Sequence, residues 1–546
     1  MAESGYSPLT KTYHSLRPAV PLPPLSQPLS VSSYTISLLR SPTTPTSAAL
    51  STTTFLIDAA TGHCITYTAF LQQVSSLSSS LKSILSKNDV AFILSPPSTH
   101  IPILYFSLLA LGVVISPANP ISSPSEINHQ IQLSKPAVAF ATAETSRKLP
   151  PNIRTILLDS AEFLTMLEPR TVNDKNDVVV RQTDSAAILY SSGTTGRVKG
   201  VVLTHRNLIS VIGGFYHSKL SDVDENGVDV HPVSLFTIPL FHVFGFFMLI
   251  RAASLGESLV LMEKFDFLKM LEAVERYKVT YIPVAPPLVV ALAKSELVDK
   301  YDLSSLRLLG CGGAALGKEV SERFRERFPN VEIHQGYGMT ETAGGATRTT
   351  GPEETKRYGS AGRLAENMEA KIVDPESGEA LPPGKRGELW LRGPAIMKGY
   401  AGDDEATAAT LDSEGWLKTG DLCYFDSEGF LFIVDRLKEL IKYKAYQVPP
   451  AELEHLLQSI PEIADAAVIP YPDDEAGEIP MAYVVRKPGS TISATQIMDS
   501  VAKQVAPYKK IRRVAFINSI PKSPAGKILR RELVNYALSS CPSSKL

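Results

Sequence analysis

Helical and strand patterns alternate along most of this chain, and that alternation limits the possible folds more than any other feature of the sequence. Apolar runs of strand length recur between amphipathic stretches of helical length. Strands are expected at 89–94, 137–141, 235–238, 258–261 and 281–284, with helices at 66–85, 122–134 and 267–277 among them. Such alternation predicts a layered α/β architecture with largely parallel sheets. Ligands of such sheets bind at loops that follow the carboxyl ends of the strands.

The pattern changes near Ala370, where short strands and turns replace the alternation. Strands are expected at 371–373, 387–392 and 431–434, which indicates a small β-rich subdomain. A charged run at 435–439 follows, and the remaining patterns suit a separate small α/β domain. The expected division is a flexible N-terminal arm (1–50), a large N-terminal domain (51–435), a mobile C-terminal domain (436–535) and a tail (536–546).

Length and charge exclude several classes of protein. The 546 residues are too many for one ordinary core, so at least two domains are expected. Lys and Arg number 54 against 56 Asp and Glu, without a basic stripe, and this balance gives no sign of a nucleic-acid partner. The longest apolar run, 101–115, is shorter than the roughly 18–20 residues of a membrane span. Because it contains Gly112 and ends at Ser116-Pro117, it predicts a buried helix followed by a buried strand.

The last three residues predict a cellular location. They are Ser544, Lys545 and Leu546, and they follow a tail rich in Ser and Pro. A terminal tripeptide of this kind is an address that the peroxisomal import receptor binds, and it is not a membrane anchor. The four cysteines lie far apart, without metal-binding spacing or a disulfide framework, which fits a reducing compartment. The predicted location is the peroxisome, with its import receptor as a partner.

Residues 190–200, which read YSSGTTGRVKG, have the composition of a phosphate-binding loop. Glycine lets the backbone approach a ligand closely, and consecutive backbone N–H groups form a concave anion site. The hydroxyls and Lys199 add further donors. The spacing is not that of a Walker A loop. Taken alone, the stretch favours a polyphosphate grip and a polar surface loop equally.

Four later stretches supply groups that would complete a nucleotide site. Residues 335–341 offer an aromatic ring for a base, a hydroxyl, and a carboxylate that can hold Mg²⁺ on phosphates. Asp421, at the end of a turn, suits the two hydroxyls of a ribose. The Lys- and Arg-rich run at 435–447, and Lys527 on a Pro- and Gly-rich turn, add cations. Each stretch alone is weak evidence, because turns, caps and solvated charges are common. Their order and spacing together are specific.

In that order and spacing the chain resembles the adenylate-forming superfamily of acyl-CoA synthetases, adenylation domains and beetle luciferases. The likeness extends from about Thr54 to about Glu532, with supporting stretches at 239–242, 387–400 and 434–448. The chain is most similar to the plant 4-coumarate–CoA ligase group, in particular its peroxisomal 4-coumarate–CoA ligase-like members. The resemblance implies the adenylate-forming fold, in which a large domain of layered α/β subdomains and a small β-rich subdomain are hinged to a small α/β C-terminal domain.

The resemblance implies a reaction in two halves. A carboxylate attacks the α-phosphate of ATP, which gives acyl-AMP and pyrophosphate, and the thiol of coenzyme A then displaces AMP. The residues implied at the β- and γ-phosphates are Ser191, Ser192, Gly193, Thr194, Thr195 and Lys199. The residues implied at the rest of the nucleotide are Ala314, Gln335 and Gly336, Tyr337 at the adenine, Thr340 at the α-phosphate, Glu341 at Mg²⁺, and Asp421 and Arg436 at the ribose. Lys527 would bridge the carboxylate and the α-phosphate, and stabilise the pentacoordinate centre more than the ground state, as catalysis requires.

The resemblance also implies that one site serves both halves through rotation of the small domain at 435–438. Rotation would remove Lys527 from the site and bring in the segment that follows the hinge. The residues implied on this segment and around coenzyme A are Lys438 and Lys442, which contact the adenylate, and Lys264, Lys444 and Ala445, which meet coenzyme A. The implied acyl pocket contains His242, which gates the inner end of the tunnel, with Phe244, Gly312, Gly313, Gly344 and Gly345.

Departures from the family pattern bear on the substrate. Ala445 stands where the family usually has Gly beside the path of the coenzyme A thiol. Phe244 replaces the Tyr of hydroxycinnamate ligases, which removes a partner for a phenolic hydroxyl. Gly344 and Gly345 replace a Pro-Val pair, and the smaller side chains are expected to deepen or widen the pocket. The last two changes favour a medium- or long-chain fatty acid or a jasmonate-precursor oxylipin over 4-coumarate.

Three other functions stay open from the sequence. The first is a true 4-coumarate or cinnamate ligase of phenylpropanoid metabolism. The second is a luciferase-like oxygenase, because beetle luciferases carry the same C-terminal address. The third, from a different class, is a non-catalytic nucleotide-binding protein. The presence of Lys199, Glu341, Asp421 and Lys527 together argues against that last function.

Overall fold

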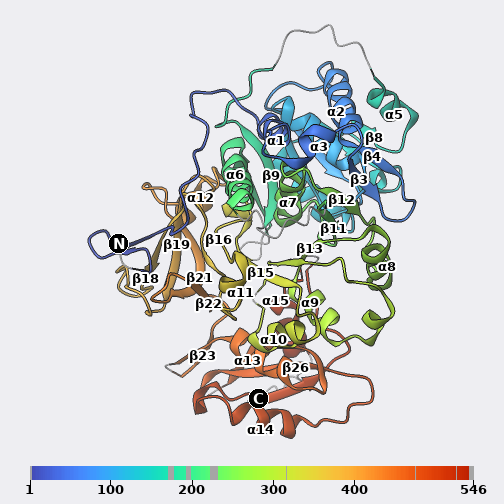
Figure 1. Cartoon of the computed structure of the whole chain (residues 1–546). Helices are drawn as coiled ribbons and strands as arrows, with labels where there is room; N and C mark the ends of the chain where they lie inside the picture. Colours follow the sequence, from blue (N-terminus) through green and yellow to red (C-terminus); the bar gives the residue numbers. More distant parts are fainter. Residues whose placement is uncertain are drawn as a thin grey trace.

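The chain folds into a large N-terminal domain and a small C-terminal domain. The computed structural model describes residues 3–169, 178–191, 198–221, 231–314, 316–444, 446–473, 475–523 and 526–539. In Figure 1 the small domain lies beneath the large one. Within these residues the large domain contains three sheets and the small domain a fourth. No helix of the described ranges is long and apolar enough to cross a membrane.

One sheet of the large domain has the strand order β20-β10-β9-β6-β5-β7-β8. Its strands are β5 (Val90–Leu94), β6 (Val114–Pro117), β7 (Val138–Ala141), β8 (Thr155–Leu157), β9 (Ser185–Ser191), β10 (Lys199–Thr204) and β20 (Gly399–Tyr400). The run from β9 to β8 is parallel, whereas β10 pairs antiparallel with β9 and β20. The helices of this part are α2 (Tyr67–Leu81), α3 (His100–Ala110), α4 (Pro124–Ser134) and α5 (Ala161–Leu167).

A second sheet of the large domain has the order β17-β16-β15-β14-β13-β11-β12-β3-β4. Its strands are β3 (Thr54–Asp58), β4 (Cys64–Thr66), β11 (Val233–Phe236), β12 (Ser258–Leu261), β13 (Tyr281–Val284), β14 (Leu308–Cys311), β15 (Glu332–Tyr337), β16 (Thr347–Arg348) and β17 (Arg363–Leu364). The run from β15 to β3 is parallel, and the flanking strands are antiparallel. Its helices are α7 (Val243–Ser254), α8 (Phe267–Tyr277), α9 (Pro286–Lys294) and α10 (Lys318–Arg327). Helix α6 (His205–Ser221) packs against α7 and against β10 of the first sheet.

Local sequence signals set the ends of several of these helices. Asp266 precedes α8 and accepts a hydrogen bond from the Lys269 backbone N–H at 3.0 Å, and Lys278 ends the helix with a φ of 49°. Ser123 and Glu126 form a reciprocal capping box at the start of α4. Such caps satisfy backbone groups that have no partner within the helix. They explain why helices at 122–134 and 267–277 are predictable from the sequence alone.

The third sheet is antiparallel and contains the chain's first strands. Its order is β1-β2-β18-β19-β21-β22, with β1 (Tyr6–Ser7), β2 (Thr12–His14), β18 (Glu369–Val373), β19 (Gly387–Arg392), β21 (Leu417–Phe425) and β22 (Leu431–Arg436). The short helix α12 (Asp404–Thr410) packs against β21, whereas α11 (Gly351–Thr355) packs against β15 of the second sheet. The β-rich subdomain expected after Ala370 is therefore present, and residues from the N-terminus join it.

The expectation of a loosely structured arm at 1–50 is wrong for the described part of that segment, 3–50. Strand β2 pairs with β18, and the ring of Tyr13 stacks on that of Phe425 at 4.5 Å between centroids. Helix α1 (Val31–Leu39) packs against α3, α6 and α7. Tyr13, Val31 and Leu39 are all at most 1% exposed. A composition rich in Ser, Thr and Pro hid the few apolar residues that anchor this segment.

The small domain has its own sheet and its own core. The order is β24-β23-β26-β25, with β27 also paired to β26, within the described residues. The strands are β23 (Ile441–Tyr443), β24 (Tyr446–Val448), β25 (Ile463–Asp473), β26 (Gly477–Arg486) and β27 (Arg513–Phe516), and the helices are α13 (Pro450–Ser459), α14 (Ala494–Ala502) and α15 (Arg530–Ser539). The chain leaves β22 at Arg436 and enters β23 at Ile441. That short connection is where a hinge was expected.

The α/β architecture and the placing of most elements are confirmed. The apolar run 101–115 forms buried helix α3 and then reaches buried strand β6. The expected fold class needs no change, because a large domain of layered sheets and a small α/β domain are both present.

Candidate active site

The candidate site lies at the carboxyl ends of the parallel strands in the second sheet. Residues 312–314 follow β14, and Gln335, Gly336 and Tyr337 end the neighbouring β15. In Figure 1, β13 and β15 lie low in the large domain, above the small domain. Parallel strands present their carboxyl ends at one edge of a sheet, so the topology brings these segments together. Gly312 is buried, whereas Gly313 and Ala314 are exposed.

The phosphate-loop stretch joins β9 to β10. Ser191 ends β9 and pairs with Lys199, the first residue of β10, so the stretch returns on itself. The residues 192–197, which include the predicted Ser192, Gly193, Thr194 and Thr195, lie outside the described residues. The Lys199 ammonium lies over the ring of Tyr400 at 4.4 Å from the centroid. An aromatic face attracts a cation at this distance, so Tyr400 helps to fix Lys199 at the mouth of the loop.

Tyr400 also contacts the carboxylate expected to hold Mg²⁺. Its hydroxyl donates to Oε1 of Glu341 at 3.0 Å, and Glu341 is 3% exposed. Glu341 belongs to a 3₁₀ turn, Thr340–Thr342, that packs against β9 and β10, and Thr340 is buried beside it. Tyr400 therefore links the phosphate-loop lysine to the predicted metal carboxylate. Sequence reasoning gave Tyr400 no role, although it lies in the stretch 387–400 that supported the resemblance.

The residues present fit Mg²⁺ held together with phosphates. No group of three or more His, Cys, Asp or Glu side chains suited to a metal occurs among the described residues. Mg²⁺ is commonly held by one or two carboxylates together with substrate phosphates. Glu341, on a turn packed against the two strands that flank the phosphate loop, has the chemistry and the place for this.

The predicted ribose residues form a buried hydrogen-bonded group. Asp421 of β21 pairs with Arg436 of β22, and Nε of Arg436 lies 3.2 Å from Oδ1 of Asp421. The hydroxyl of Tyr337 donates to Oδ2 of the same carboxylate at 2.6 Å. Burial raises the pKa of Asp421 above its usual range, although Arg436 and the Tyr337 hydroxyl oppose that rise. Two of these residues were expected at the ribose, and the structure adds the direct bond to Tyr337.

Lys527 reaches this group from the small domain. Burial lowers the pKa of Lys527, as does the nearby Arg436, while Glu439 and Asp421 oppose the change. The charge of Lys527 in turn stabilises ionised Asp421. A Cβ added at Gly526 would lie 3.1 Å from the Cβ of Ala285, at the start of α9 in the large domain. The loop before α15 therefore touches the large domain, and it carries Lys527 to the site.

A buried ionic cluster that sequence reasoning missed supports this loop. Arg530, at the start of α15, lies 2.8 Å from Glu454 and 3.3 Å from Glu439. Asp435 accepts hydrogen bonds from the backbone N–H groups of Arg436 and Ala451 at 2.7 and 2.9 Å. The cluster connects the hinge segment, α13 and the start of α15. Its only sequence signal was the charged run at 435–439.

The pKa of Glu454 in that cluster is raised, mainly by burial. Burial raises it to about 7, and the charges of Asp435 and Glu439 add to the rise, while Arg530 and the Val468 backbone N–H oppose it. Burial likewise raises the pKa of Asp435. Burial and the neighbouring carboxyl groups therefore favour the protonated form of Glu454, against the opposing charge of Arg530.

His242 and Phe244 lie at the start of α7, as part of the expected acyl pocket. His242 caps the helix, and its Nδ1 accepts the Phe244 backbone N–H at 3.3 Å. Burial lowers the pKa of His242 to about 4, so the imidazole is neutral at neutral pH. A Cβ added at Gly312 would lie 3.6 Å from the Phe244 ring. The structure therefore brings Phe244 beside the glycine at the adenylate site.

The expectation that Gly344 widens the acyl pocket is wrong, and only Gly345 opens space. Gly344 has a φ of +90°, and a Cβ there would lie 2.3 Å from the ring of Phe247. The room that a side chain would need at Gly344 is filled by that ring. A Cβ on Gly345 would instead make an ordinary contact of 3.5 Å with Val211. Gly345 also lines a small cavity.

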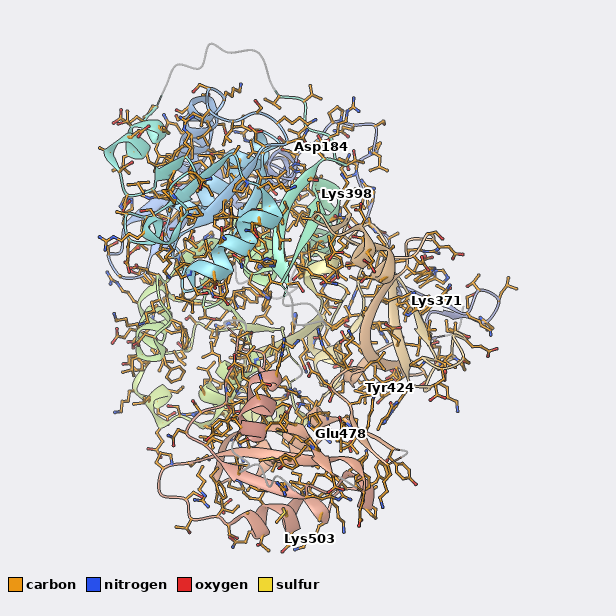
Figure 2. All side chains as sticks on the ribbon, turned by 180° about the vertical axis from the view of Figure 1, so that it is seen from behind. Asp184, Lys371, Lys398, Tyr424, Glu478 and Lys503 are labelled. Atoms are coloured by element: carbon orange, nitrogen blue, oxygen red, sulfur yellow. The ribbon has the colours of Figure 1, made fainter. Side chains whose placement is uncertain are left out.

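The lysines implied in coenzyme A binding are not gathered at the site. Lys442 lies in β23, and its backbone N–H donates to Glu478 at 2.7 Å. Figure 2 places Glu478 on the small domain. Lys444 is exposed in the turn after β23, and Lys264 is exposed in the loop before α8. Figure 1 shows β23 and α8 on opposite sides of the molecule.

The arrangement of the domains thus suits one half of the expected reaction. Lys527 lies near Asp421, whereas Lys442 and Lys444 lie away from the site. Lys438 lies in the connection between β22 and β23, and Ala445 falls outside the described residues. This is the arrangement expected for attack of an acid on ATP, before rotation of the small domain.

Comparisons with known proteins identify the family of the chain. The sequence pattern of the AMP-binding enzymes matches residues 44–401, and that of the AMP-binding enzyme C-terminal domain matches residues 452–527. The chain is 59% identical over 545 residues to 4-coumarate–CoA ligase-like 9 of Arabidopsis thaliana, covering 98% of this chain and 96% of the relative. It is 44% identical over 559 residues to peroxisomal OPC-8:0-CoA ligase 1 of the same plant, covering 99% and 98%.

A solved structure with a bound intermediate has the same fold. It is o-succinylbenzoate-CoA synthetase from Bacillus subtilis in complex with its acyl-adenylate intermediate. The two chains are 25% identical and superpose with a TM-score of 0.77, over 94% of this chain and 99% of the other.

Proposed function

We propose, from the premise that the chain belongs to the AMP-binding enzyme family and is an AMP-forming acyl-CoA ligase, that it activates a medium- or long-chain fatty acid or an oxylipin of the jasmonate-precursor type. ATP and coenzyme A are its co-substrates. The proposed boundary between the two domains lies between residues 435 and 436, and the described residues 3–50 belong with the large domain.

In the first half of the reaction, a carboxylate oxygen of the acid attacks the α-phosphorus of ATP, and pyrophosphate leaves. Lys199, Ser191 and the loop 192–195 hold the departing phosphates. Asp421 and Arg436 hold the ribose, and Thr340 contacts the α-phosphate. Little covalent help is needed, because phosphoryl transfer depends mostly on positioning and on neutralising charge.

The bond between Tyr337 and Asp421 suggests how the ribose enters. The Tyr337 hydroxyl satisfies one oxygen of a buried carboxylate, at 2.6 Å. A ribose hydroxyl would replace the phenol there, and the freed ring of Tyr337 would be able to lie against the adenine, beside Gln335, Gly336 and Ala314. A buried carboxylate is costly without a donor, so the exchange keeps it satisfied before and after ATP binds.

Mg²⁺ would be held by Glu341 together with the phosphates, and would neutralise charge that builds up on them. Tyr400 holds the Glu341 carboxylate and faces Lys199, so one side chain orients both the metal carboxylate and the phosphate-loop cation.

In the second half, the small domain rotates about 435–438, and Lys527 leaves the site. The thiolate of coenzyme A then attacks the acyl carbonyl, and AMP leaves. Lys438 and Lys442 contact the adenylate after the rotation, and Lys444, the chain near Ala445, and Lys264 meet coenzyme A. His242 gates the inner end of the acyl tunnel, next to Phe244.

The observation that carries the proposal is the place of Lys527. A lysine from the small domain lies in the electrostatic reach of Asp421 and Arg436, on a loop that touches the start of α9. Its ammonium would bridge the acid carboxylate and the α-phosphate, where negative charge grows in the transition state.

Exchange of Lys527 for Ala tests this role. We expect acid-dependent release of pyrophosphate to fall by about 100- to 1,000-fold, as when a preorganised transition-state donor is removed. Conversion of pre-formed acyl-AMP and coenzyme A to product should stay near the wild-type rate, because Lys527 leaves the site in that half. The matched control is Lys522→Ala, since Lys522 pairs with Asp465 at 2.5 Å within the small domain. Pyrophosphate release at the wild-type rate in Lys527→Ala would refute the mechanism.

The choice of acid rests on the pocket. Phe244 offers no hydroxyl to a phenol, and Gly345 opens on a cavity, which supports a longer acid over 4-coumarate. The relative whose name specifies a peroxisomal OPC-8:0-CoA ligase supports the same class. A panel of straight-chain acids, oxylipins, cinnamate and 4-coumarate, assayed for CoA esters, separates these substrates. A preference for 4-coumarate would refute this assignment and leave the ligase activity intact.

The proposed location is the peroxisome. Residues 540–546, which contain Ser544, Lys545 and Leu546, lie outside the described residues. The terminal tripeptide and the named peroxisomal relative support the proposal. A fluorescent fusion at the N-terminus should enter peroxisomes, and deletion of the three residues should leave it in the cytosol.

A further inference from the structure

A small cavity lies beside Gly345, one of the residues that the resemblance implies in the acyl pocket. Its volume is about 20 Å³, enough for about one water-sized group. Its lining includes Val211, Gly214 and Phe215 of α6, Gly345, Arg348 of β16, and Glu366. The lining is apolar on one side and carries a buried ion pair on the other.

Three phenylalanine rings connect the adenylate site with this cavity. The ring of Phe244 lies beside Gly312, and the centroids of Phe244 and Phe247 are 5.8 Å apart. The rings of Phe247 and Phe215 are stacked, with centroids 5.7 Å apart. The guanidinium of Arg348 then lies over the Phe215 ring at 4.8 Å. The three rings form an apolar wall that begins beside Gly312 and ends at the Arg348 guanidinium.

The ion pair at the end of this wall is buried and incompletely satisfied. Nη2 of Arg348 lies 2.6 Å from Oε1 of Glu366, and the two side chains are 11% and 7% exposed. The same nitrogen donates to the Gly214 carbonyl at 3.3 Å. Oε2 of Glu366 is buried, and among the described residues it has no hydrogen-bonding partner. A buried carboxylate oxygen without a donor is costly, so a ligand that supplies a donor would be bound here.

The contacts that anchor the N-terminal segment do not explain this oxygen. The Arg348 backbone carbonyl accepts from Nη2 of Arg17 at 2.5 Å. Asn367, next to Glu366, accepts the Val20 backbone N–H at 3.2 Å. These bonds use the backbone of Arg348 and the neighbouring asparagine. Neither uses Oε2 of Glu366, which instead lies 2.7 Å from the position that a Cβ of Gly214 would take.

We propose that Glu366 and Arg348 bind a hydroxyl group at the far end of the acid, and that the enzyme selects hydroxylated acids long enough to reach this cavity. A hydroxyl donates one hydrogen bond and accepts others. It would donate to Oε2 of Glu366 and accept from the Arg348 guanidinium, while the chain lies along the wall of Phe244, Phe247 and Phe215. The inference rests on the proposed function, and it narrows the substrate class.

A methyl end group would be discriminated against for a physical reason. It would fill the cavity and leave the Glu366 oxygen without a donor, so the site would bear the cost of an unsatisfied buried charge. Sites built to hydrogen-bond a substrate hydroxyl reject analogues without it far more strongly than apolar pockets distinguish a methylene. The site therefore selects the hydroxyl group, and the chain length of the acid determines whether that hydroxyl reaches Glu366.

The test compares pairs of acids on the purified full-length enzyme. Each pair is a straight-chain acid and the ω-hydroxy acid of the same length, over a series of lengths, with kcat and KM for CoA-ester formation measured separately. At the matching length we expect kcat/KM to favour the hydroxy acid by about 10- to 100-fold, mainly through KM, because hydrogen bonds to charged groups are the stronger kind. At shorter lengths the ratio should return to about one.

Two variants isolate the oxygen. Glu366→Gln keeps an acceptor for Arg348 and places an NH₂ group where Oε2 was, so a hydroxyl can no longer donate there. Gly214→Ala puts a methyl group into the space beside Oε2. Both should lower the preference for the hydroxy acid at the matching length. The matched control is Gly213→Ala on the same helix. Gly213 does not line this cavity, and a Cβ added there would lie 3.0 Å from the Tyr34 hydroxyl.

The outcomes separate this inference from the proposed function. If the enzyme makes CoA esters but treats hydroxy and straight-chain acids alike at every length, the hydroxyl site is refuted and the ligase stands. If Glu366→Gln keeps the wild-type ratio, the carboxylate does not bind the hydroxyl and the proposal also fails. If no acid of the series gives pyrophosphate or a CoA ester, the proposed function fails, and the inference fails with it. A purely structural ion pair would lower the activity on both acids of a pair equally.

Discussion

Replacement of Glu454 by Gln should stabilise the small domain in a pH-dependent way. Glu454 is 5% exposed, and its Oε2 lies 2.8 Å from Arg530. Its Oε1 accepts the Val468 backbone N–H at 2.7 Å. Burial, with Asp435 and Glu439 nearby, raises its pKa from 4.5 to about 7. The glutamine keeps an oxygen for Val468 and removes the charge that burial disfavours.

The sign and size of the effect follow from linkage. Between about pH 4.5 and 7 the folded state holds a proton that the unfolded chain has lost, so the native state is favoured at the lower pH. The stability contributed by protonated Glu454 is fully present below about pH 4.5 and is lost as the pH rises through about 7. At about 1.4 kcal/mol per pKa unit, the loss amounts to roughly 3 kcal/mol by pH 8. A neutral glutamine does not incur that loss.

The measurement is a urea series read by pulsed hydrogen exchange on peptides from α13, because two domains need not unfold together. We expect the free energy of unfolding of Glu454→Gln, minus that of the wild type, to rise by roughly 3 kcal/mol between about pH 5 and pH 8. This is a shift of roughly 1–3 M in the urea midpoint. A pH-independent difference in the free energy of unfolding reflects the altered contact with Arg530. Only the pH-dependent part of that difference tests the effect of the raised Glu454 pKa.

The matched control is Glu452→Gln on the same helix. Glu452 is 39% exposed and pairs with Lys509 at 2.7 Å. Surface pairs contribute about 0–1 kcal/mol, so this variant should differ little in stability from the wild type. The reasoning is refuted if Glu454→Gln differs from the wild type by a constant amount, or loses stability as the pH rises.

Two further predictions concern the candidate site. Tyr400→Phe removes the hydroxyl that donates to Glu341 at 3.0 Å but keeps the ring under Lys199. We expect the Mg²⁺ and ATP concentrations for half-maximal rate to rise about fivefold, with little change in thermal stability. Unchanged concentrations would contradict a role for this bond. Gly344→Ala forces a Cβ to 2.3 Å from the Phe247 ring at a φ of +90°, which should lower the free energy of unfolding by about 1–3 kcal/mol and reduce acyl turnover. Gly345→Ala should be tolerated. Equal effects of the two substitutions on calorimetric unfolding would contradict the packing of Phe247 against Gly344.

Much of the fold was predictable because its signals are local. Periodicity and caps over ten or so residues predicted α4, α8 and the parallel strands. The order of the short polar stretches carries the family resemblance, and that resemblance predicts that Lys199, Glu341, Asp421 and Lys527 serve one site. The N-terminal segment was not predictable in this way, because its anchors, Tyr13 among them, are few and contact strands more than 300 residues later, as in the Tyr13 bond to Leu381.

The sequence by itself determined the α/β class and the two-domain plan, and it predicted the reacting groups. Only the tertiary structure decided how those groups are held. Tyr337 and Asp421 are 84 residues apart, and Tyr400 and Glu341 are 59 apart, so no local pattern reveals their hydrogen bonds. Gly344 looked like open space in the sequence, yet the Phe247 ring fills it. The physical reason is range: periodicity and composition record neighbours along the chain, whereas packing, burial and the pKa of Glu454 depend on neighbours that only folding brings into contact.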